Sequence, residues 1–279
     1  MKTEENLQVW NEGYYWEARG DEWSRPWGNA EQHWFSSILP RIHRLLPAPT
    51  ILEIAPGYGR WTSFLRRLCD RLIVVDLSPN CIEGCKKRFS QDTHIEYHVN
   101  DGSSLEMVPD ASVDLVFSYD SLVHVEADVI RRYLDQLARK LTPEGAGFIH
   151  HSNAGSYQAR LEVKSRIRAF VEPLPVFNLL RKIHGLVKPS LNSHWRAPSV
   201  DRQVFAEAAE QAELTCLSQE VIRWHDTKLW TDCMSIFALK DSLLAQGWGP
   251  VAFLQNEGFQ AEVVNAKAIS ALYSPVKPR

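Results

Sequence analysis

The stretch that decides the fold is Ile51-Leu-Glu-Ile-Ala-Pro-Gly-Tyr-Gly-Arg60. It begins with a short apolar run, typical of a buried strand, and it ends in a glycine turn that leads into a helical pattern. Glycines at the end of a first strand let the backbone turn tightly and approach a ligand closely. An acidic residue, Glu53, lies inside the strand, four positions before Gly57. Gly-x-Gly alone is a weak signal, so its meaning depends on the neighbouring segments.

Strands and helices alternate after this turn. Strands are predicted over 51–55, 72–76, 95–99, 113–118 and 147–151, with helices over 59–69, from Ser78 onward, and over 126–141. A later helix over 201–213 is followed by two strand-like runs, 215–224 and 229–239, joined by turn residues. The pattern predicts an α/β fold with a Rossmann-like, doubly wound sheet, mostly parallel, closed by an antiparallel C-terminal hairpin.

The chain divides into three parts around this core. Residues 1–46 form an aromatic-rich N-terminal cap segment that ends in an amphipathic helix over 29–46. The core extends over 47–240 and contains a basic, proline-bearing insertion, 155–195, which we interpret as a helical lid. Residues 241–279 form a C-terminal extension whose pattern indicates only additional cover.

Composition excludes several functional classes. The 279 residues carry a net charge of −3 and are 44% hydrophobic, so the chain can bury a core but has no basic field for nucleic acid or for an anionic membrane. No apolar run reaches the length of a membrane span. The five cysteines lack paired spacing, which favours free thiols in a reducing compartment. We therefore expect a cytoplasmic protein without a membrane or nucleic-acid partner; a homo-oligomer is compatible with the sequence.

Each of the first three predicted strands has an acidic residue inside it, at its end or just after it. Besides Glu53, Asp76 ends the second strand, where one carboxylate can accept both hydroxyls of a ribose, and Asp101 follows the third strand. Over roughly residues 50–150 this arrangement resembles the class I S-adenosylmethionine-dependent methyltransferase family. The helix over 201–213 and the hairpin over 215–239 complete the seven-stranded sheet that is usual for that family.

The resemblance implies a role for each of these positions. Gly57 and Gly59 pass under S-adenosylmethionine, Glu53 organises its amino-acid end, Asp76 binds the ribose diol and Asp101 binds the adenine amino group. Ala55 stands where the family has its first glycine, and we expect the cost to be small because alanine fits a strand end. The predicted cofactor site is Glu53, Ala55, Gly57, Gly59, Asp76, Leu77, Asp101, Gly102 and Ser118.

A nicotinamide-binding Rossmann enzyme is the main rival interpretation. Asp76 does not separate the two families, because both place a carboxylate there. The glycine pattern does, since Gly-x-Gly-x-x-Gly would require a glycine where this chain has Thr62. The C-terminal hairpin also favours the methyltransferase.

The predicted reaction site lies where strands four and five end. Strand four is followed by Asp120 and His124, and strand five ends in His150 and His151. Side chains alternate along a strand, so only one of these two histidines can face the cleft. We expect His151 to be the general base, with Asp120 or His124 beside it, and His150 to be a satisfied buried residue. Asp120 with a histidine could instead hold a divalent cation, but two ligands are too few, and no metal is predicted.

The expected acceptor is a small molecule. Aromatic residues crowd the first 34 positions, among them Trp10, Trp16 and Trp23, and aromatic rings stack against sugar faces. With a histidine base, this favours O-methylation of a hydroxyl on a saccharide or a similar polar small molecule. An N-methyltransferase of a small metabolite and a catalytically inactive S-adenosylmethionine-binding protein are the alternatives, although the polar ends of strands four and five argue for activity.

Overall fold

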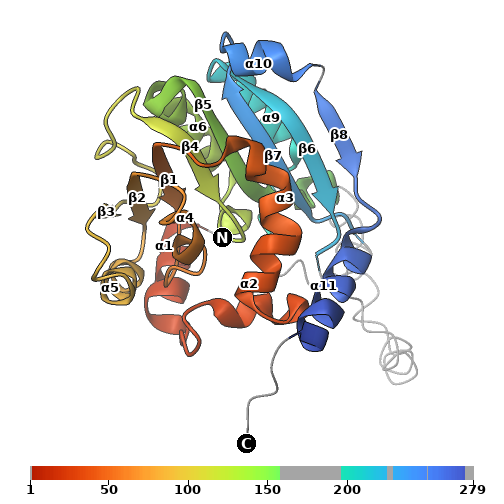
Figure 1. Ribbon diagram of the computed structural model, residues 1–279. Helices are drawn as coiled ribbons and strands as arrows, with labels where there is room; N and C mark the ends of the chain where they lie inside the picture. The colour runs from red at the N-terminus through yellow and green to blue at the C-terminus, as the bar shows by residue number, and fades with distance from the viewer. Residues whose placement is uncertain (1, 158–195, 225–228, 250, 274–279) are drawn as a thin grey trace, which may run out of the picture.

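An eight-stranded sheet forms the centre of the computed structural model, which describes residues 2–157, 196–224, 229–249 and 251–273 (Figure 1). The strands lie in the order β3-β2-β1-β4-β5-β7-β6-β8. Their bounds are β1 Thr50–Ile54, β2 Arg71–Asp76, β3 Ile95–Val99, β4 Val113–Ser118, β5 Leu141–Ser152, β6 Leu214–Ile222, β7 Asp232–Leu239 and β8 Ala252–Gln255.

Strand directions agree with the sequence prediction. The pairs β1–β2, β1–β4, β2–β3 and β4–β5 are parallel. β7 is antiparallel to both β5 and β6, which confirms the C-terminal hairpin. β8 adds a further parallel strand beside β6, which was not predicted because its four residues are all exposed and carry no alternating pattern. The doubly wound, mostly parallel α/β fold is thus confirmed.

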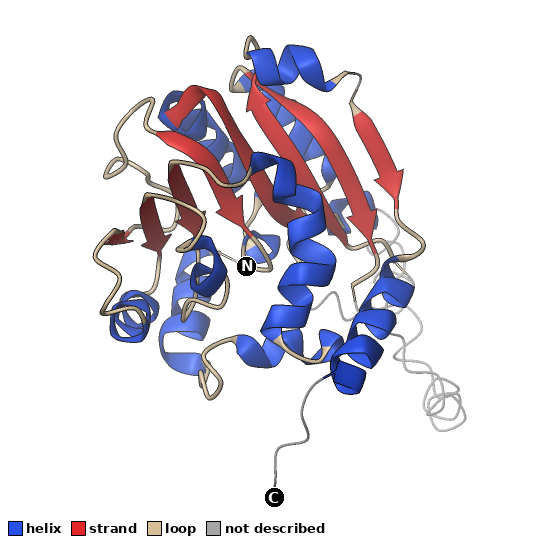
Figure 2. Cartoon of the chain, in the orientation of Figure 1, coloured by secondary structure: helices blue, strands red, loops and turns tan. Residues whose placement is uncertain are grey.

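Helices cover both faces of the sheet (Figure 2). α6 (Ala127–Lys140) buries an apolar stripe and α9 (Arg202–Gln211) packs against it. α5 (Pro79–Arg88) begins at Ser78, whose hydroxyl accepts a hydrogen bond from the Cys81 N–H, as a helix N-cap does. The helix expected over 59–69 is shorter, because only α4 (Thr62–Leu65) is α-helical. In the described ranges no helix combines the length and apolarity needed to cross a membrane.

The N-terminal segment forms much of the layer over the face of the sheet opposite to α6 and α9. It comprises α1 (Thr3–Gln8), a π-helical turn Val9–Gly13, a 3₁₀ helix Asp21–Trp27, α2 (Ala30–His33), a π-helical turn Trp34–Ile38, α3 (Leu39–Ile42) and a 3₁₀ turn His43–Leu45. The helix predicted over 29–46 is therefore present, with a π-helical turn just before Pro40, whose ring disfavours regular α-helical bonding. Trp34, Ile38 and Ile42 are buried, as their spacing indicates.

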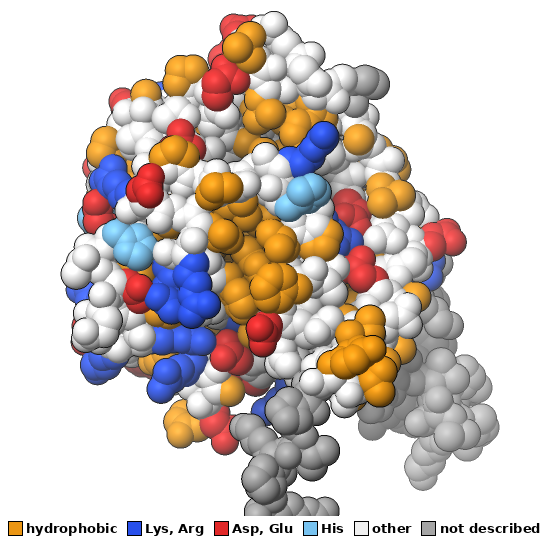
Figure 3. All heavy atoms as spheres, in the orientation of Figure 1, with side chains coloured by type: hydrophobic (Ala, Val, Ile, Leu, Met, Phe, Trp, Pro, Cys, Tyr) orange, Lys and Arg blue, Asp and Glu red, His pale blue; other side chains and the backbone are white. Residues whose placement is uncertain are grey.

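The C-terminal extension returns to the N-terminal helices. α10 (Leu243–Trp248) leads through β8 to α11 (Phe259–Tyr273), which packs beside α2 (Figure 1). The Arg41 guanidinium donates to Glu220 on β6 at 2.6 and 2.7 Å and to Glu262 on α11 at 3.1 Å. Residues distant in sequence are thereby joined in one layer. Apolar side chains also gather on the face shown in Figure 3. Phe35 in the π-helical turn Trp34–Ile38 and Leu272 in α11 are among the exposed large apolar residues.

Gly147 on β5 provides a test of how tightly the sheet is packed. A methyl group at this position would overlap the Phe237 ring on β7. We expect Gly147→Ala to lower the free energy of unfolding by about 1–3 kcal/mol, as overpacking of a core does. Gly247→Ala is the matched control, because Gly247 has open space around it and lies in α10, where alanine is favoured over glycine. Urea denaturation of both variants would show whether only the first is destabilised; equal stabilities would contradict this packing.

Candidate functional site

A cavity of about 380 Å³ lies at the carboxyl ends of β1, β2 and β4. This volume is in the range of small-molecule pockets. The ends of the strands form one wall of the cavity, and the N-terminal segment contributes Thr3, Asn6, Trp10, Trp16, Gly20 and Trp23 to its lining. The cavity is also where the strand order reverses between β1 and β4, the usual place for ligands in an open parallel sheet.

Five of the predicted cofactor residues meet in this cavity, namely Ala55, Gly57, Asp76, Leu77 and Gly102. The Asp76 carboxylate accepts hydrogen bonds from the Gly57 N–H at 3.1 Å and the Ser78 N–H at 2.8 Å. Burial raises the pKa of Asp76 to about 6, and these backbone bonds oppose the shift. The carboxylate is therefore held in a fixed orientation beside the glycine turn.

Gly57 is the point where the N-terminal segment approaches the strand end most closely. Its φ of +58° is left-handed, and a Cβ built there would lie 2.7 Å from the Trp16 ring. Trp16 also stacks on Tyr58, with ring centroids 4.8 Å apart. Only glycine satisfies both the backbone angle and the close contact. The aromatic N-terminal segment thus packs directly against the glycine turn.

Ala55 differs from expectation. Its φ is +57°, so alanine occupies a left-handed conformation and not the extended one of a strand end. For an L-residue this conformation costs about 1–2 kcal/mol relative to the right-handed region. The expectation that alanine is accommodated at little cost is therefore wrong, because the chain has already begun its turn at this position.

Two predicted cofactor residues lie outside the cavity lining and have packing roles. Gly59 has a φ of +82°, and a Cβ there would overlap the Phe89 ring beside α5. Ser118 is fully buried and donates its hydroxyl hydrogen bond to the Ile54 carbonyl at 2.9 Å, joining β4 to β1. Both side-chain positions thus face neighbouring elements of the fold, and the roles of Gly59 and Ser118 in cofactor binding remain predictions.

Glu53 and Asp101 also lie outside the lining. Glu53 is buried; its Oε2 accepts a hydrogen bond from Thr62 at 2.5 Å, while its Oε1 accepts none from the described residues. Asp101 is exposed, and its Oδ1 accepts hydrogen bonds from the backbone N–H groups of Ser103 and Ser104 at 2.9 and 2.7 Å. The sequence-based roles of Glu53 at the amino-acid end and of Asp101 at the adenine remain predictions.

Asp120 and His124 both line the cavity, as expected. His124 ends the 3₁₀ turn Leu122–His124 and lies against Trp10, with ring centroids 5.4 Å apart. Asp120 has a left-handed φ of +61° and pairs with Arg60 at 3.0 Å and with Arg196 at 3.7 Å. Burial acts to raise the pKa of Asp120, but the two guanidinium groups outweigh it and hold that pKa below its ordinary value. Asp120 is therefore an ionised, paired carboxylate.

The position of His151 on β5 contradicts the prediction. His151 is fully buried on the side of α9, stacked on Phe205 with ring centroids 4.1 Å apart, and its Nε2 is 2.8 Å from the Ser235 hydroxyl. Burial lowers the pKa of His151 to about 3. Alternation along β5 was predicted correctly, but the choice of the face was wrong, because local sequence does not reveal which layer covers the cavity. His151 cannot act on a ligand there.

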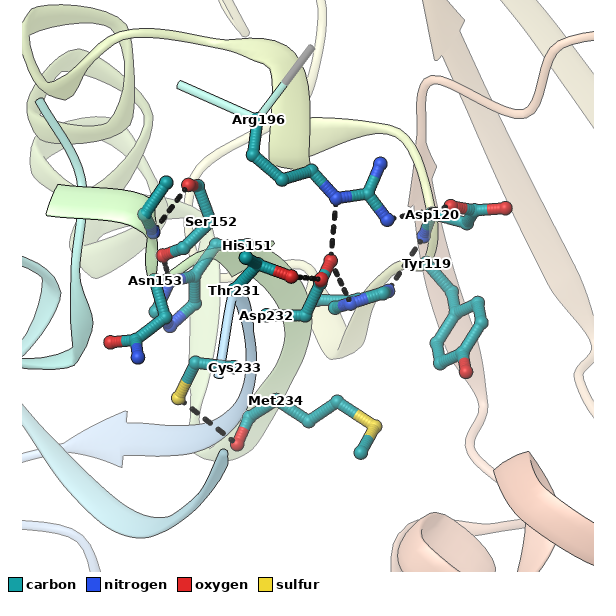
Figure 4. A network of polar contacts seen from close by, with 12 residues as sticks. Tyr119, Asp120, His151, Ser152, Asn153, Arg196, Thr231, Asp232, Cys233 and Met234 are labelled. Atoms are coloured by element: carbon teal, nitrogen blue, oxygen red, sulfur yellow. Dashed lines mark hydrogen bonds and ion pairs between the residues drawn. The ribbon is translucent and has the colours of Figure 1, made fainter. Parts of the chain in front are cut away.

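His150 belongs instead to a buried network below Asp120. The Asp120 N–H donates to His150 Nδ1 at 3.2 Å, and His150 Nε2 donates to Asp232 at 3.2 Å. Asp232 also accepts a hydrogen bond from Arg196 Nε at 2.7 Å (Figure 4). Since Nδ1 is an acceptor, the His150 imidazole is neutral. This network is the satisfied environment that was expected for His150.

Sequence reasoning did not single out Arg60, Arg196 or Asp232. Arg60 could have been predicted from the sequence, because it directly follows the glycine turn. Its cation lines the cavity at the end of β1. Arg196 follows residues 158–195, which include most of the predicted lid and lie outside the described residues. No local pattern connects Arg196 with Asp232. The described ranges contain no group of three or more His, Cys, Asp or Glu side chains placed to hold a metal ion.

Comparison with known proteins agrees with this geometry. Residues 51–145 match the family model described as a methyltransferase domain. Nodulation protein S of Rhizobium tropici is 25% identical over 146 residues, 52% of this chain and 59% of that protein. Phosphoethanolamine N-methyltransferase 1 of Triticum aestivum is 28% identical over 119 residues, 40% of this chain and 24% of that protein. The chain thus spans less than two thirds of the length of these relatives.

Solved structures show the same fold. The PH0226 protein of Pyrococcus horikoshii OT3 superposes with a TM-score of 0.52 at 16% identity, covering 86% of this chain and all of that chain. An S-adenosylmethionine-dependent methyltransferase from Clostridium acetobutylicum ATCC 824 gives a TM-score of 0.53 at 13% identity, covering 79% of this chain and 96% of that one. At these identities the likeness establishes the fold alone.

The environment of Glu53 predicts a pH-dependent stability. Burial raises the pKa of Glu53 from its ordinary 4.5 to about 8. Between these pH values the folded chain keeps a proton that the unfolded chain has lost, so the free energy of unfolding falls as pH rises. Glu53→Gln removes this loss, and its stability advantage over the wild type should grow by a few kcal/mol (about 1.4 per pH unit at most) from pH 5 to pH 8.

Urea denaturation at four pH values would measure this difference. Glu106→Gln, at an exposed position, is the matched control and should follow the wild-type profile. Parallel profiles for Glu53→Gln and the wild type would show that Glu53 is ionised in the folded protein.

Proposed function

Since residues 51–145 form a methyltransferase domain in a class I S-adenosylmethionine-dependent fold, we propose that the chain transfers a methyl group from S-adenosylmethionine to a hydroxyl of a saccharide or a similar polar small molecule. The observation that carries the proposal is the shared cavity. His124 lines the same cavity as Gly57, Asp76, Leu77 and Gly102. A proton acceptor and the cofactor residues therefore meet at one site.

The residues present suit this cofactor. The fixed Asp76 carboxylate would accept hydrogen bonds from the ribose diol, and Gly57 leaves the backbone open to close approach. Leu77 and Gly102 would flank the adenine. Glu53 is buried behind the turn, and its Oε1, which accepts no hydrogen bond from the described residues, would accept one from the amino-acid end of the cofactor. When bound, S-adenosylmethionine supplies an activated methyl group on a sulfonium for in-line displacement.

His124 is the proposed general base. A hydroxyl has a pKa far above 7, so its attack on a methyl carbon needs a group that removes the proton. His124 follows β4 and faces the cavity, whereas Asp120 is engaged with Arg60 and is a weak base because its pKa is held low. The contact with Trp10 fixes the imidazole ring. His124 thus takes the role that the sequence assigned to His151.

The cavity walls support a saccharide acceptor. Trp23 is exposed and lines the cavity, so its ring offers a flat apolar surface of the kind that stacks on the C–H face of a sugar ring. Arg60 and Asp120 also line the cavity and can bind hydroxyl groups. Aromatic surfaces combined with a few fixed polar groups are typical of small-molecule pockets.

N-methylation of an amine is the second candidate function. The same aromatic walls can attract a cation, and one relative is named as a phosphoethanolamine N-methyltransferase. An amine that enters unprotonated needs no general base, so the two functions differ in their dependence on His124. An inactive cofactor-binding protein would be expected to have lost polar residues around the acceptor, and this cavity retains Asp120 and His124.

The role of Asp76 predicts a loss of cofactor affinity. Asp76→Ala removes both ribose contacts and leaves the hydroxyls unpaired, so binding of S-adenosylhomocysteine should weaken by about 2–3 kcal/mol in calorimetry. Asp101→Ala measured alongside tests the adenine role, since only a loss of affinity would support it. Wild-type affinity in Asp76→Ala, or tight binding of NADH by the wild type, would contradict the cofactor site.

The role of His124 predicts a loss of turnover without a loss of cofactor binding. His124→Ala should lower kcat by about 10²–10⁴-fold while leaving the affinity for S-adenosylhomocysteine nearly unchanged. His98→Ala is the control, because His98 lies on β3 outside the cavity lining. Transfer of labelled methyl groups to a pool of saccharides and amines would provide the readout. Full activity of His124→Ala on an amine, with none on hydroxyls, would favour the N-methyltransferase.

A further inference from the structure

We propose that Arg60, Asp120 and Arg196 form a subsite that binds neighbouring hydroxyl groups of an uncharged polyol ring and discriminates against charged acceptors. This inference rests on the proposed function and names the class of its substrate. All three residues line the cavity, and Asp120 lies between the two arginines. Their side chains are only 8%, 9% and 3% exposed, respectively. A ligand that fills the cavity would meet these charged groups where little solvent competes for them.

The hydrogen-bonding capacity of this cluster is not exhausted. Arg60 has five N–H donors, and its hydrogen bonds within the described residues go to Ser24 at 3.4 Å and to Asp120 Oδ2 at 3.0 Å. Asp120 Oδ1 is 3.7 Å from Arg196, an ion-pair distance that is longer than a hydrogen bond. Donors and an acceptor oxygen therefore stand side by side. A hydroxyl both donates and accepts, so two neighbouring hydroxyls complement this pair.

The charges of the surrounding network cancel. Arg196 Nε donates to Asp232 at 2.7 Å, behind the cavity wall. Burial acts to raise the pKa of Asp232, but the Arg196 guanidinium and the hydrogen bond from His150 outweigh it and lower that pKa to about 2, so Asp232 is ionised. His150 is neutral because its Nδ1 accepts the Asp120 N–H. Two arginines thus face two aspartates, and the net charge of these four side chains is zero.

This balance determines which acceptors fit. A charged group brought against the cluster would lose its hydration and gain no counter-ion, which is costly in a buried site. A neutral hydroxyl group loses less hydration and recovers its hydrogen bonds. An ammonium or carboxylate group at the subsite is therefore disfavoured, and a neutral diol is favoured.

Two tryptophans hold the cluster in place. The Arg60 guanidinium lies 4.4 Å from the Trp61 ring centroid, and the Arg196 guanidinium lies 5.3 Å from that of Trp224. Both rings line the cavity. Cation–π contacts fix the planes of the guanidinium groups. A ring that carries hydroxyls on its edge matches this arrangement.

The test uses sugars that share a ring and differ in charge. Glucose, glucosamine and glucuronate, with the corresponding galacto and manno series, would be titrated in the presence of S-adenosylhomocysteine and observed by saturation-transfer NMR. The wild type should bind a neutral sugar at least about tenfold more tightly than its charged counterparts. Asp120→Asn leaves the cluster with one positive charge and should shift the preference to the uronate. Arg60→Gln leaves one negative charge and should shift it to the amino sugar.

The double variant Arg60→Gln/Asp120→Asn is the matched control. It restores a net charge of zero to the cluster and should therefore restore the preference for the neutral sugar. Unchanged binding of S-adenosylhomocysteine shows that each variant is folded. The inference is overturned if the wild type binds none of the neutral sugars, if it binds a charged one as tightly, or if the four proteins share one preference. A wild type that fails to bind S-adenosylhomocysteine or to transfer methyl groups would contradict the proposed function, whereas transfer to a charged acceptor would contradict this inference alone.

Discussion

The chain passes from β1 to β2 on one side and returns on the other side of β1 as β4, so the connections that follow β1 and β4 lead in opposite directions. Parallel strands bring their carboxyl ends to one edge, and the divergence leaves an opening between them. Asp76 lies at this edge because it ends β2, whereas Gly57 and Asp120 follow the ends of β1 and β4 by three and two residues, respectively. The cavity, its polar wall and its aromatic cover all follow from this reversal of strand order.

Local patterns predicted the half of the site that local geometry builds. Asp76 ends β2, and Gly57, Leu77 and Gly102 follow their strands within three residues. A strand–turn–helix pattern places such residues without knowledge of distant contacts. Gly59 and Ser118 belong to the same segments, but their roles depend on Phe89 and on the Ile54 carbonyl, respectively. The sequence motif alone therefore did not show which of its residues line the cavity and which pack against neighbouring elements.

The other half of the site depends on tertiary contacts. His150 and His151 occupy equivalent positions in the sequence pattern, and only the layer formed by the N-terminal helices and α11 determines which face of β5 lies beneath the cavity. The pairing of Arg196 with Asp232 joins residues 36 positions apart. The sequence likewise did not predict the left-handed backbone conformation of Ala55, because an alanine at this position also fits a strand. The sequence therefore predicted the fold class and several of the strand-end residues that line the cavity, but not the contacts of the wall around Asp120.

A crystal structure with S-adenosylhomocysteine tests the central claim most directly, namely that the cavity at the ends of β1, β2 and β4 holds the cofactor. The account predicts ribose hydroxyls on Asp76, the homocysteine chain along Gly57, and the sulfur directed toward the space in front of His124. A cofactor bound elsewhere, or one whose sulfur lies remote from His124 and from the Arg60–Asp120 wall, would contradict it.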